Sequence, residues 1–170
     1  MNMTSTSPDQ LTSEQKRALY MQLVQNRSSQ PNTCPLSFSQ EGLWFLEQME
    51  PVSATYNNWR AFRLKGPLDH GALEKSVREI VRRHETLRTR FVVINEKPVQ
   101  SILPSFEALL PLTDLSSMPA DQREAEARRL TSKEVVTPFH LSTGPLFRAK
   151  LLRLSKNDHV FILTIHPIIS

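Results

Sequence analysis

The sequence predicts an α/β fold of the α+β type, with a mixed β-sheet covered by helices. Segments with apolar residues at helical spacing are interspersed along the chain with short segments that are typical of strands. Prolines and other turn formers separate these segments. The sequence has no internal repeat, which excludes solenoids and propellers from the fold classes to consider.

The amino-terminal part is predicted to lie outside the main fold. Residues 1–11 are polar, and we expect them to be disordered. Residues 12–35 are expected to form a short amphipathic helix and a linker, because Thr12 and Gln15 form a capping box. The apolar stripe of this helix consists of Ala18, Leu19 and Leu23. Two interpretations stay open: the helix docks another polypeptide, or it packs on its own fold.

The next segments predict a helix and a strand. Ser37 and Gln40 form a second capping box, and the helix that they begin runs until Pro51. The segment Tyr56–Leu64 alternates in the manner of a strand, and Gly66 ends it.

The middle of the chain predicts a long helix followed by a hairpin. Asp69 is suited to cap the helix. One continuous buried stripe is expected from the apolar residues at helical spacing, which are Leu73, Val77, Ile80, Val81, His84 and Leu87. Strands Arg88–Ile94 and Val99–Leu103 should pair around a turn at Asn95–Lys97. A further short strand is expected at Leu109–Leu112.

The last part predicts a helix and a second hairpin. The helix has Pro119 in its first turn and continues through Glu134. Strands Leu146–Leu154 and His159–Ile165 follow, joined by the polar turn Ser155–Asp158. Because the sequence stops shortly after an apolar strand, we expect that further chain normally follows.

The composition indicates a soluble, cytoplasmic protein without a membrane anchor. The 170 residues suffice for one domain or for one lobe of a larger domain. No apolar run approaches the roughly 20 residues of a membrane-spanning helix, and the first residues do not resemble a secretory signal. The single Cys34 cannot form an internal disulfide, so we infer a reducing setting and interpret Cys34 as an incidental thiol.

The net charge of +4 is concentrated in one stretch. Between Arg60 and Arg90, nine Lys or Arg residues stand against four Asp or Glu residues, which predicts a mildly positive face. This density is too low for a nucleic-acid site, and no stacking aromatics accompany it. The two open interpretations are an acidic protein partner and a solvated helix face.

Three segments carry patterns beyond secondary structure. The first is Leu36–Leu46, with Ser37, Gln40 and Trp44. The second is Arg83–Phe91, whose fixed positions are Arg83, His84, Glu85, Leu87, Arg88 and Phe91. The third begins at Gly144–Ala149 and ends in Thr164–Ser170.

Together these segments resemble the condensation domain family of nonribosomal peptide synthetases, which shares its fold with chloramphenicol acetyltransferase. The resemblance covers residues 36–170 and implies the amino-terminal lobe of a two-lobe domain, truncated within the active-site motif. Glu41 and Gly42 depart from an arginine-containing pattern in the first segment. From the residues alone, the second segment could equally be a helix end with a structural His84 and a solvent-facing Glu85.

The third segment occupies the place of the family's active-site motif, in which two histidines precede an aspartate and a glycine. Pro167 stands where the family has the second histidine, which helps the acceptor amine attack the donor thioester. Proline has neither a titratable group nor a backbone N–H, so we expect no catalytic residue in this chain. His166 corresponds to the first histidine, and we interpret it as a packing residue rather than a base. The motif's aspartate and glycine would follow Ser170.

Arg88 matches a family arginine that forms a buried ion pair with that aspartate. In this chain the aspartate is not present. A buried, unpaired guanidinium is costly, so we expect Arg88 to find another acceptor or to reach water.

The resemblance implies a parent activity that transfers an acyl group from a phosphopantetheine thioester to the amine on a second carrier protein. Our first hypothesis is a catalytically inactive lobe that acts as a platform for an adjacent adenylation or carrier domain. The second is an active condensation enzyme completed by a second lobe, and the third is a module that recruits a tailoring enzyme. We expect no metal and no directly bound cofactor, since the partner carries the phosphopantetheine. An isolated lobe should also expose apolar surface around Ile168 and Ile169, and self-associate.

Overall fold

The computed structural model describes Thr12, residues 14–17, residues 32–49, Ala54 and residues 56–170. The chain forms two compact units, residues 1–32 and 33–170. In the first unit, Thr12 and Gln15 exchange the two hydrogen bonds of the predicted capping box, at 2.9 and 3.3 Å. The predicted stripe of Ala18, Leu19 and Leu23 and the disordered segment 1–11 lie outside the described residues.

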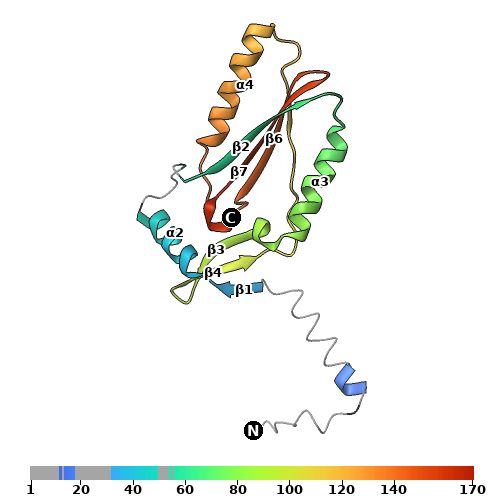
Figure 1. Ribbon diagram of the computed structural model, residues 1–170. Helices are drawn as coiled ribbons and strands as arrows, with labels where there is room; N and C mark the ends of the chain where they lie inside the picture. Colours follow the sequence, from blue (N-terminus) through green and yellow to red (C-terminus); the bar gives the residue numbers. More distant parts are fainter. Residues whose placement is uncertain (1–11, 13, 18–31, 50–53, 55) are drawn as a thin grey trace. The chain divides into compact units, whose positions relative to one another are not determined.

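The second unit is built on a four-stranded sheet in the order β2-β7-β6-β5 (Figure 1). Its strands are β2 (Asn58–Lys65), β5 (Leu112–Asp114), β6 (Phe147–Ser155) and β7 (Asp158–Ile165). The strands β6 and β7 form the predicted hairpin, β2 pairs antiparallel with β7, and β5 pairs parallel with β6. The predicted mixed sheet is therefore confirmed.

A second sheet has three strands in the order β1-β4-β3. The predicted hairpin is present as β3 (Thr89–Ile94) and β4 (Lys97–Ile102). Its turn is one residue shorter than predicted, because Asn95 and Glu96 both take positive φ angles of 50° and 64° and close a two-residue turn. The prediction of a linker up to residue 35 is wrong at its end, where β1 (Asn32–Pro35) adds to β4. Composition favours a loop there, but pairing with a formed hairpin overrides it.

Among the described residues of this unit, three α-helices accompany the sheets: α2 (Phe38–Met49), α3 (His70–Arg83) and α4 (Ala120–Val135). The predicted caps of the first two are confirmed. Ser37 and Gln40 exchange hydrogen bonds of 2.9 and 3.3 Å, and the Asp69 carboxylate accepts from the Ala72 amide at 3.0 Å. Pro119 immediately precedes α4.

The predicted stripe of α3 is right at its centre and wrong at its end. Val77 and Val81 are buried, whereas Ile80 is half exposed. The helix stops at Arg83 because His84 takes an extended conformation and is exposed. The chain then forms a 3₁₀ turn, η2 (Glu85–Arg88), before β3. The predicted strand and helix therefore do not meet directly.

The two long helices cover opposite faces of the four-stranded sheet. Val77 and Val81 of α3 share one core cluster with alternate residues of β6, which are Phe147, Ala149 and Leu151. Ala127 of α4 shares a second cluster with Leu152 and Leu154, which follow in β6 and point to the opposite face. Successive side chains of a strand point to opposite faces, so β6 serves both layers.

The strand predicted at Leu109–Leu112 is displaced to Leu112–Asp114. The backbone of Leu110 is bonded to α3 instead of to the sheet. His70 Nε2 donates to the Leu110 carbonyl at 2.9 Å, and the Leu110 amide lies 3.5 Å from the Glu74 carboxylate. These side-chain contacts bind the segment to α3 up to Leu110, and the first bond to β6 follows at Pro111, whose carbonyl accepts from the Leu151 amide at 3.0 Å.

Candidate functional site

The third motif forms a tight turn at the end of β7. Pro167 begins the 3₁₀ turn η3 (Pro167–Ile169), and the His166 amide donates to the Leu146 carbonyl at 2.9 Å. His166 Nδ1 accepts a hydrogen bond of 3.2 Å from the Ile168 amide. The imidazole is 3% exposed and meets the Phe139 ring edge-on, with 6.1 Å between the ring centroids. The ring is thus fixed by its own turn and by the core.

Burial lowers the pKa of His166 from 6.5 to about 4, so this imidazole is neutral at physiological pH. Because Nδ1 accepts from an amide, the ring proton sits on Nε2. That nitrogen has no hydrogen-bond partner, and the buried Glu47 carboxylate of α2 lies 4.0 Å from it. The arrangement points the imidazole at protein groups rather than at open solvent.

Pro167 contributes geometry and no chemistry to this turn. A proline at the first position of a 3₁₀ turn has its φ angle already set and lacks an N–H that the turn would leave without a partner. Its side chain is half-buried. Position 167 therefore shapes the backbone that follows β7 but offers neither a base nor a hydrogen-bond donor.

The structure brings the first and third motifs together. Gln40 Nε2 donates to the Ile168 carbonyl at 3.1 Å and lies 3.3 Å from Gln100 Oε1 of β4. Trp44, one turn further along α2, packs half-buried against the core. Ser37 is exposed and acts only as the helix cap. The opening motif thus links α2 to the η3 turn.

The second motif is divided between core and surface. Phe91 is buried and Leu87 packs against the same core, whereas His84 is exposed. Arg83 is also exposed and pairs with Glu79 of its own helix at 2.7 Å. In these residues the structure joins a surface helix end to a buried strand.

Arg88 is the inward-facing cation of this motif. Its Nη1 donates to the Leu103 carbonyl, and its Nη2 lies 3.6 Å from the exposed Glu85 carboxylate. The expected replacement acceptor is therefore a backbone carbonyl, with a long and mostly solvated ion pair beside it.

Most of the basic stretch from Arg60 to Arg90 is paired with acidic groups, so the predicted positive face is largely wrong. The pairs are Arg63 with Glu124 and Asp158, Lys65 with Asp158, Arg78 with Glu74 and Glu107, and Arg82 and Arg83 with Glu79. Three of these partners, Glu107, Glu124 and Asp158, come from outside the stretch and could not be seen by counting charges within it.

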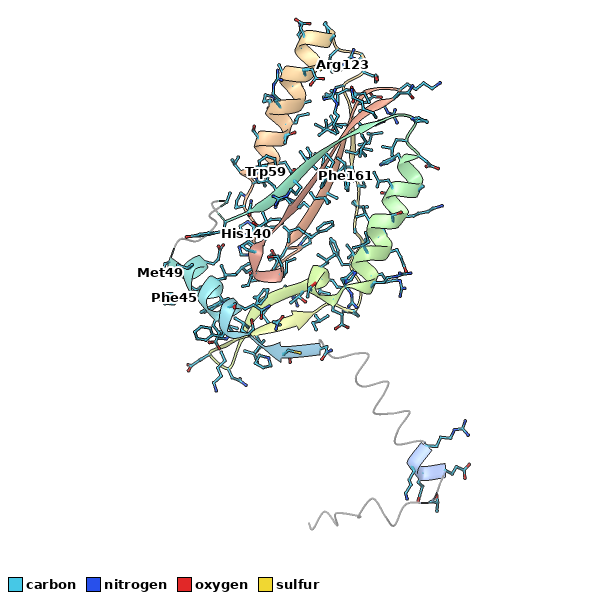
Figure 2. All side chains as sticks on the ribbon, viewed as in Figure 1. Phe45, Met49, Trp59, Arg123, His140 and Phe161 are labelled. Carbon is cyan, nitrogen blue, oxygen red and sulfur yellow. The ribbon has the colours of Figure 1, made fainter. Side chains whose placement is uncertain are left out.

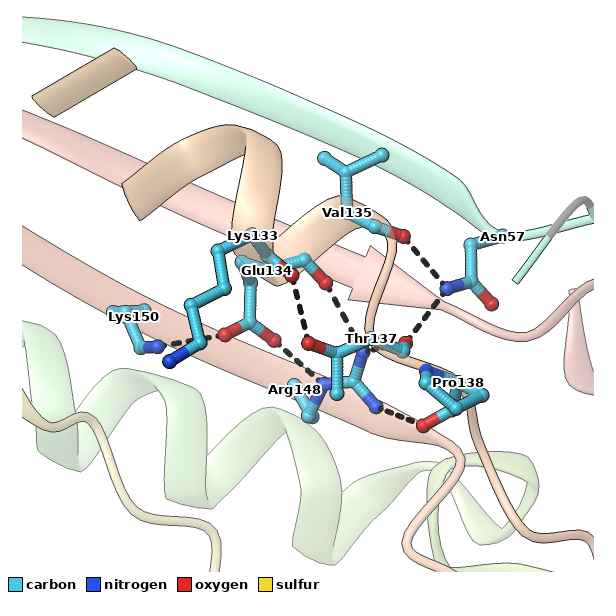
Figure 3. A network of polar contacts seen from close by, with 8 residues as sticks. All are labelled: Asn57, Lys133, Glu134, Val135, Thr137, Pro138, Arg148 and Lys150. Carbon is cyan, nitrogen blue, oxygen red and sulfur yellow. Dashed lines mark hydrogen bonds and ion pairs between the residues drawn. The ribbon is translucent and has the colours of Figure 1, made fainter. Parts of the chain in front are cut away.

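Sequence reasoning missed a polar network that ends α4 (Figure 3). The Glu134 carboxylate pairs with Arg148 at 2.6 Å and with Lys150 at 2.7 Å. Arg148 also donates to the carbonyls of Thr137 and Pro138, at 2.6 and 3.1 Å. The sequence did contain a signal for this network. Arg148 and Lys150 occupy alternate positions of an apolar strand, so both must face the same side of the sheet and need an acidic partner there.

The network keeps a nearly buried carboxylate charged. Burial raises the pKa of Glu134, but the hydrogen bonds from Lys150 and Arg148 outweigh it, so the pKa lies below its ordinary value. Asn57 Nδ2 adds two further hydrogen bonds, to the carbonyls of Val135 and Thr137, at 2.8 and 2.9 Å. The carbonyls at the end of α4 are thus capped from β6 and from the residue before β2.

Within the part of the chain that the structure describes, no three His, Cys, Asp or Glu residues gather in a way that could hold a metal ion. Among these same residues, no helix has the length and apolar character that crossing a membrane requires.

A family model described as condensation domain matches residues 30–170. The chain belongs to the condensation domain family. A linear gramicidin synthase of Brevibacillus parabrevis is 48% identical over 135 residues, which are 79% of this chain and 3% of that protein. Phosphinothricin tripeptide synthetase PhsB of Streptomyces viridochromogenes is 39% identical over 138 residues, or 81% of this chain and 12% of that protein.

Solved condensation domains have the same fold. The starter condensation domain of rhizomide synthetase RzmA matches 81% of this chain with a TM-score of 0.74 and 25% identity. The first condensation domain of the calcium-dependent antibiotic synthetase matches 79% with a TM-score of 0.70 and 28% identity. This chain spans 34% and 32% of those two chains, and it spans 12% or less of the synthetases named above. The expected chloramphenicol acetyltransferase-like fold and family are confirmed.

Proposed function

We propose that this chain is a noncatalytic part of a nonribosomal peptide synthetase condensation domain, serving as a structural and docking platform for an adjacent carrier or adenylation domain. The observation that carries the proposal is Pro167 in the η3 turn. It stands at the position where the family motif has its second histidine, and a proline cannot accept or donate a proton.

His166 cannot take over the missing role. The pKa of about 4 makes this imidazole a weak base, and its Nδ1 lone pair is already used by the Ile168 amide. Its Nε2 lies toward Glu47 in the interior. A substrate amine would have to displace protein groups to reach either nitrogen.

The docking role is supported by an apolar stripe on the outer side of α2. Phe38, Phe45 and Met49 are spaced by seven and four residues, fall on one side of the helix, and are mostly exposed. Figure 2 shows Phe45 and Met49 directed away from the sheets. Large exposed apolar side chains in a row are typical of a surface that binds another protein. A carrier protein would bring its own phosphopantetheine, in the cytoplasm, so this chain needs no cofactor of its own.

The catalytic half of the proposal is tested with two carrier proteins loaded with aminoacyl groups. The chain, in the full polypeptide that contains it, should form no dipeptidyl thioester above the rate without protein, because no group at position 167 handles the proton. Product is measured by mass spectrometry of the carrier. Formation of dipeptidyl thioester by the unchanged protein would refute the proposal.

The docking half is tested on the α2 stripe. Phe45→Asp should weaken binding of the carrier or adenylation domain by about tenfold, because one buried aromatic side chain contributes roughly 1.4 kcal/mol or more to an interface. Leu109→Asp is the matched control, since Leu109 is 58% exposed and Phe45 is 59% exposed. Binding is measured by calorimetry with each purified domain.

If Phe45→Asp and Leu109→Asp weaken binding equally, the added charge itself causes the loss at any exposed apolar position. The α2 stripe would then not be the docking surface. If a tailoring enzyme binds and neither the carrier domain nor the adenylation domain does, the chain recruits that enzyme and is not a platform for the synthetase domains.

A second candidate function is condensation itself, completed by the remainder of the domain. The contact between Gln40 and the Ile168 carbonyl favours it, since the turn that carries the motif is still held in place. If Pro167 is the sole defect, Pro167→His should raise dipeptide formation by about 100-fold or more, the usual contribution of a general base. An unchanged rate in a folded variant excludes this candidate.

A further inference from the structure

A hollow of about 440 Å³ lies at the opposite end of β7 from His166. Three separate turns form it: the one after β2 contributes Pro67 and Leu68, the one after β5 contributes Ser116, and the β6–β7 turn contributes Lys156. The hollow therefore has an apolar wall and a polar wall. None of its residues takes part in the motif turn or in the α2 stripe.

The polar wall carries two cations and one anion. Arg153 Nη1 lies 3.1 Å from the Asp114 carboxylate, whose other oxygen accepts from the Ser116 amide at 2.9 Å. This pair engages one terminal nitrogen of the Arg153 guanidinium, so the other N–H groups of the guanidinium can donate to a ligand. Lys156 is exposed in the turn and forms no ion pair with any residue that the structure describes. The hollow thus has a net positive charge.

His159 is the buried member of this wall. It is 2% exposed, lies opposite Arg153 in the β6–β7 register, and its Nδ1 has no hydrogen-bond partner. A buried polar atom without a partner is uncommon, and one explanation is a ligand that the site is shaped to receive. Burial, and then the charge of Arg153, lower the pKa of His159, so the ring is neutral and can donate one N–H.

The pairing of β6 with β7 changes register between Arg153 and Ser155, at the end of the sheet that borders the hollow. A β-bulge re-aims the side chains beside it, and bulges are frequent next to binding sites. Here the register shift lies at the strand end that carries Arg153, directly before the turn with Lys156.

We propose that this hollow binds the phosphate group of a small molecule, with Arg153 and Lys156 as charged donors and His159 as a neutral donor. A phosphate offers oxygens in several directions, which suits donors that come from a strand, a turn and the facing strand. Pro67 and Leu68 would contact an organic group attached to the phosphate. This inference does not depend on the function proposed above.

The test is titration of the full 170-residue chain with inorganic phosphate at constant ionic strength, followed by calorimetry and by the ring nitrogen resonances of the histidines. The resonances of His159 should shift with saturation, and those of His166 should not. Lys156→Gln should weaken phosphate binding about fivefold, the loss of roughly one charge-assisted hydrogen bond. Lys133→Gln, an exposed lysine on α4, should have no effect.

Phenyl phosphate distinguishes the source of the phosphate. If phenyl phosphate binds more tightly than inorganic phosphate, and Leu68→Ser removes this difference, the ligand is an organic phosphate ester. If both bind equally, the ligand is free phosphate. Two outcomes overturn the proposal: no shift of the His159 resonances at about 50 equivalents of phosphate over the protein, or equal weakening by Lys156→Gln and Lys133→Gln.

Discussion

At the scale of single residues, His166 shows how one side chain can be kept for structure. The ring accepts from the Ile168 amide, which needs a neutral imidazole, and it packs edge-on against Phe139, which fixes its orientation. A charged ring at this place would have to leave water and would lose its acceptor nitrogen. The position therefore favours a flat, neutral acceptor over a base.

This predicts a pH dependence of stability. The pKa of His166 is about 4 in the folded chain and near 6.5 when unfolded, so below pH 6.5 the unfolded state binds a proton that the folded state does not. The free energy of unfolding should fall as the pH drops from 6.5 to 4, by on the order of 3 kcal/mol in total. His166→Asn keeps an acceptor for the Ile168 amide and should remove this part of the fall.

The measurement is urea unfolding of both proteins at several pH values between 4 and 7. His159, whose pKa is also lowered, is present in both proteins, so the difference between them isolates His166. Parallel pH profiles would contradict the assignment of a buried neutral imidazole. Acidic groups with lowered pKa values, such as Asp158 at about 2, act at lower pH.

At the scale of elements, α4 is joined to the sheet by charge as much as by apolar contact. Its last turn places Glu134 against two cations of β6, and Arg148 also lies over the Phe139 ring, 3.8 Å from its centre. A guanidinium that binds a carboxylate, two carbonyls and an aromatic face fixes where the helix ends.

Arg148→Leu should therefore lower the free energy of unfolding by about 3 kcal/mol, because it leaves the nearly buried Glu134 with one cation and frees the carbonyls of Thr137 and Pro138. Arg129→Leu is the control. It breaks an exposed pair with Glu126 on the same helix, and solvent screening makes the expected loss of stability small compared with that of Arg148→Leu. Urea unfolding measures both, and similar losses would contradict the role given to Arg148.

The sequence predicted where these elements begin better than where they end. The caps at Ser37 and Asp69 use side chains within three residues of the amides they bind, so local sequence contains the whole interaction. The displacement of β5 depends on a partner far along the chain. Leu110, for example, is held by His70, which lies 40 residues away.

At the scale of the whole molecule, the expected exposed patch at Ile168 and Ile169 is wrong. These side chains are 2% and 7% exposed, because the η3 turn folds them back into the core. Exposed apolar side chains lie on several other elements, including α2 and β2, and on β2 Trp59 and Phe62 are both partly exposed. Since β2 is an edge strand of the four-stranded sheet, self-association remains a prediction with a different location.

Phe62→Glu should lower self-association, because it places a charge on the open edge of the sheet. Ile80→Glu on α3 is the control, since Ile80 is 50% exposed and Phe62 is 46% exposed. Light scattering over a range of protein concentrations measures the average mass. An equal fall in both variants would indicate a general charge effect, and a monomeric unchanged protein would contradict the prediction.

The candidate site was predicted only in part. The motif patterns singled out His166, Pro167 and Arg88, but they did not predict the 3₁₀ turn that Pro167 begins. The contact of Gln40 with the Ile168 carbonyl joins residues 128 positions apart, and the single sequence offers no physical signal for it. Burial of His166 likewise depends on Phe139 and α2, which only the fold brings together.

The two ends of α4 are attached in unlike ways. Near the start of the helix, Glu124 pairs with Arg63 at 2.6 Å, and both side chains are partly exposed; at the other end Glu134 is almost fully covered. Dissolved ions weaken the first attachment far more than the second. In concentrated salt the helix should therefore open from its amino-terminal turns, and amide hydrogen exchange should be fastest there while Val135 and its neighbours stay protected.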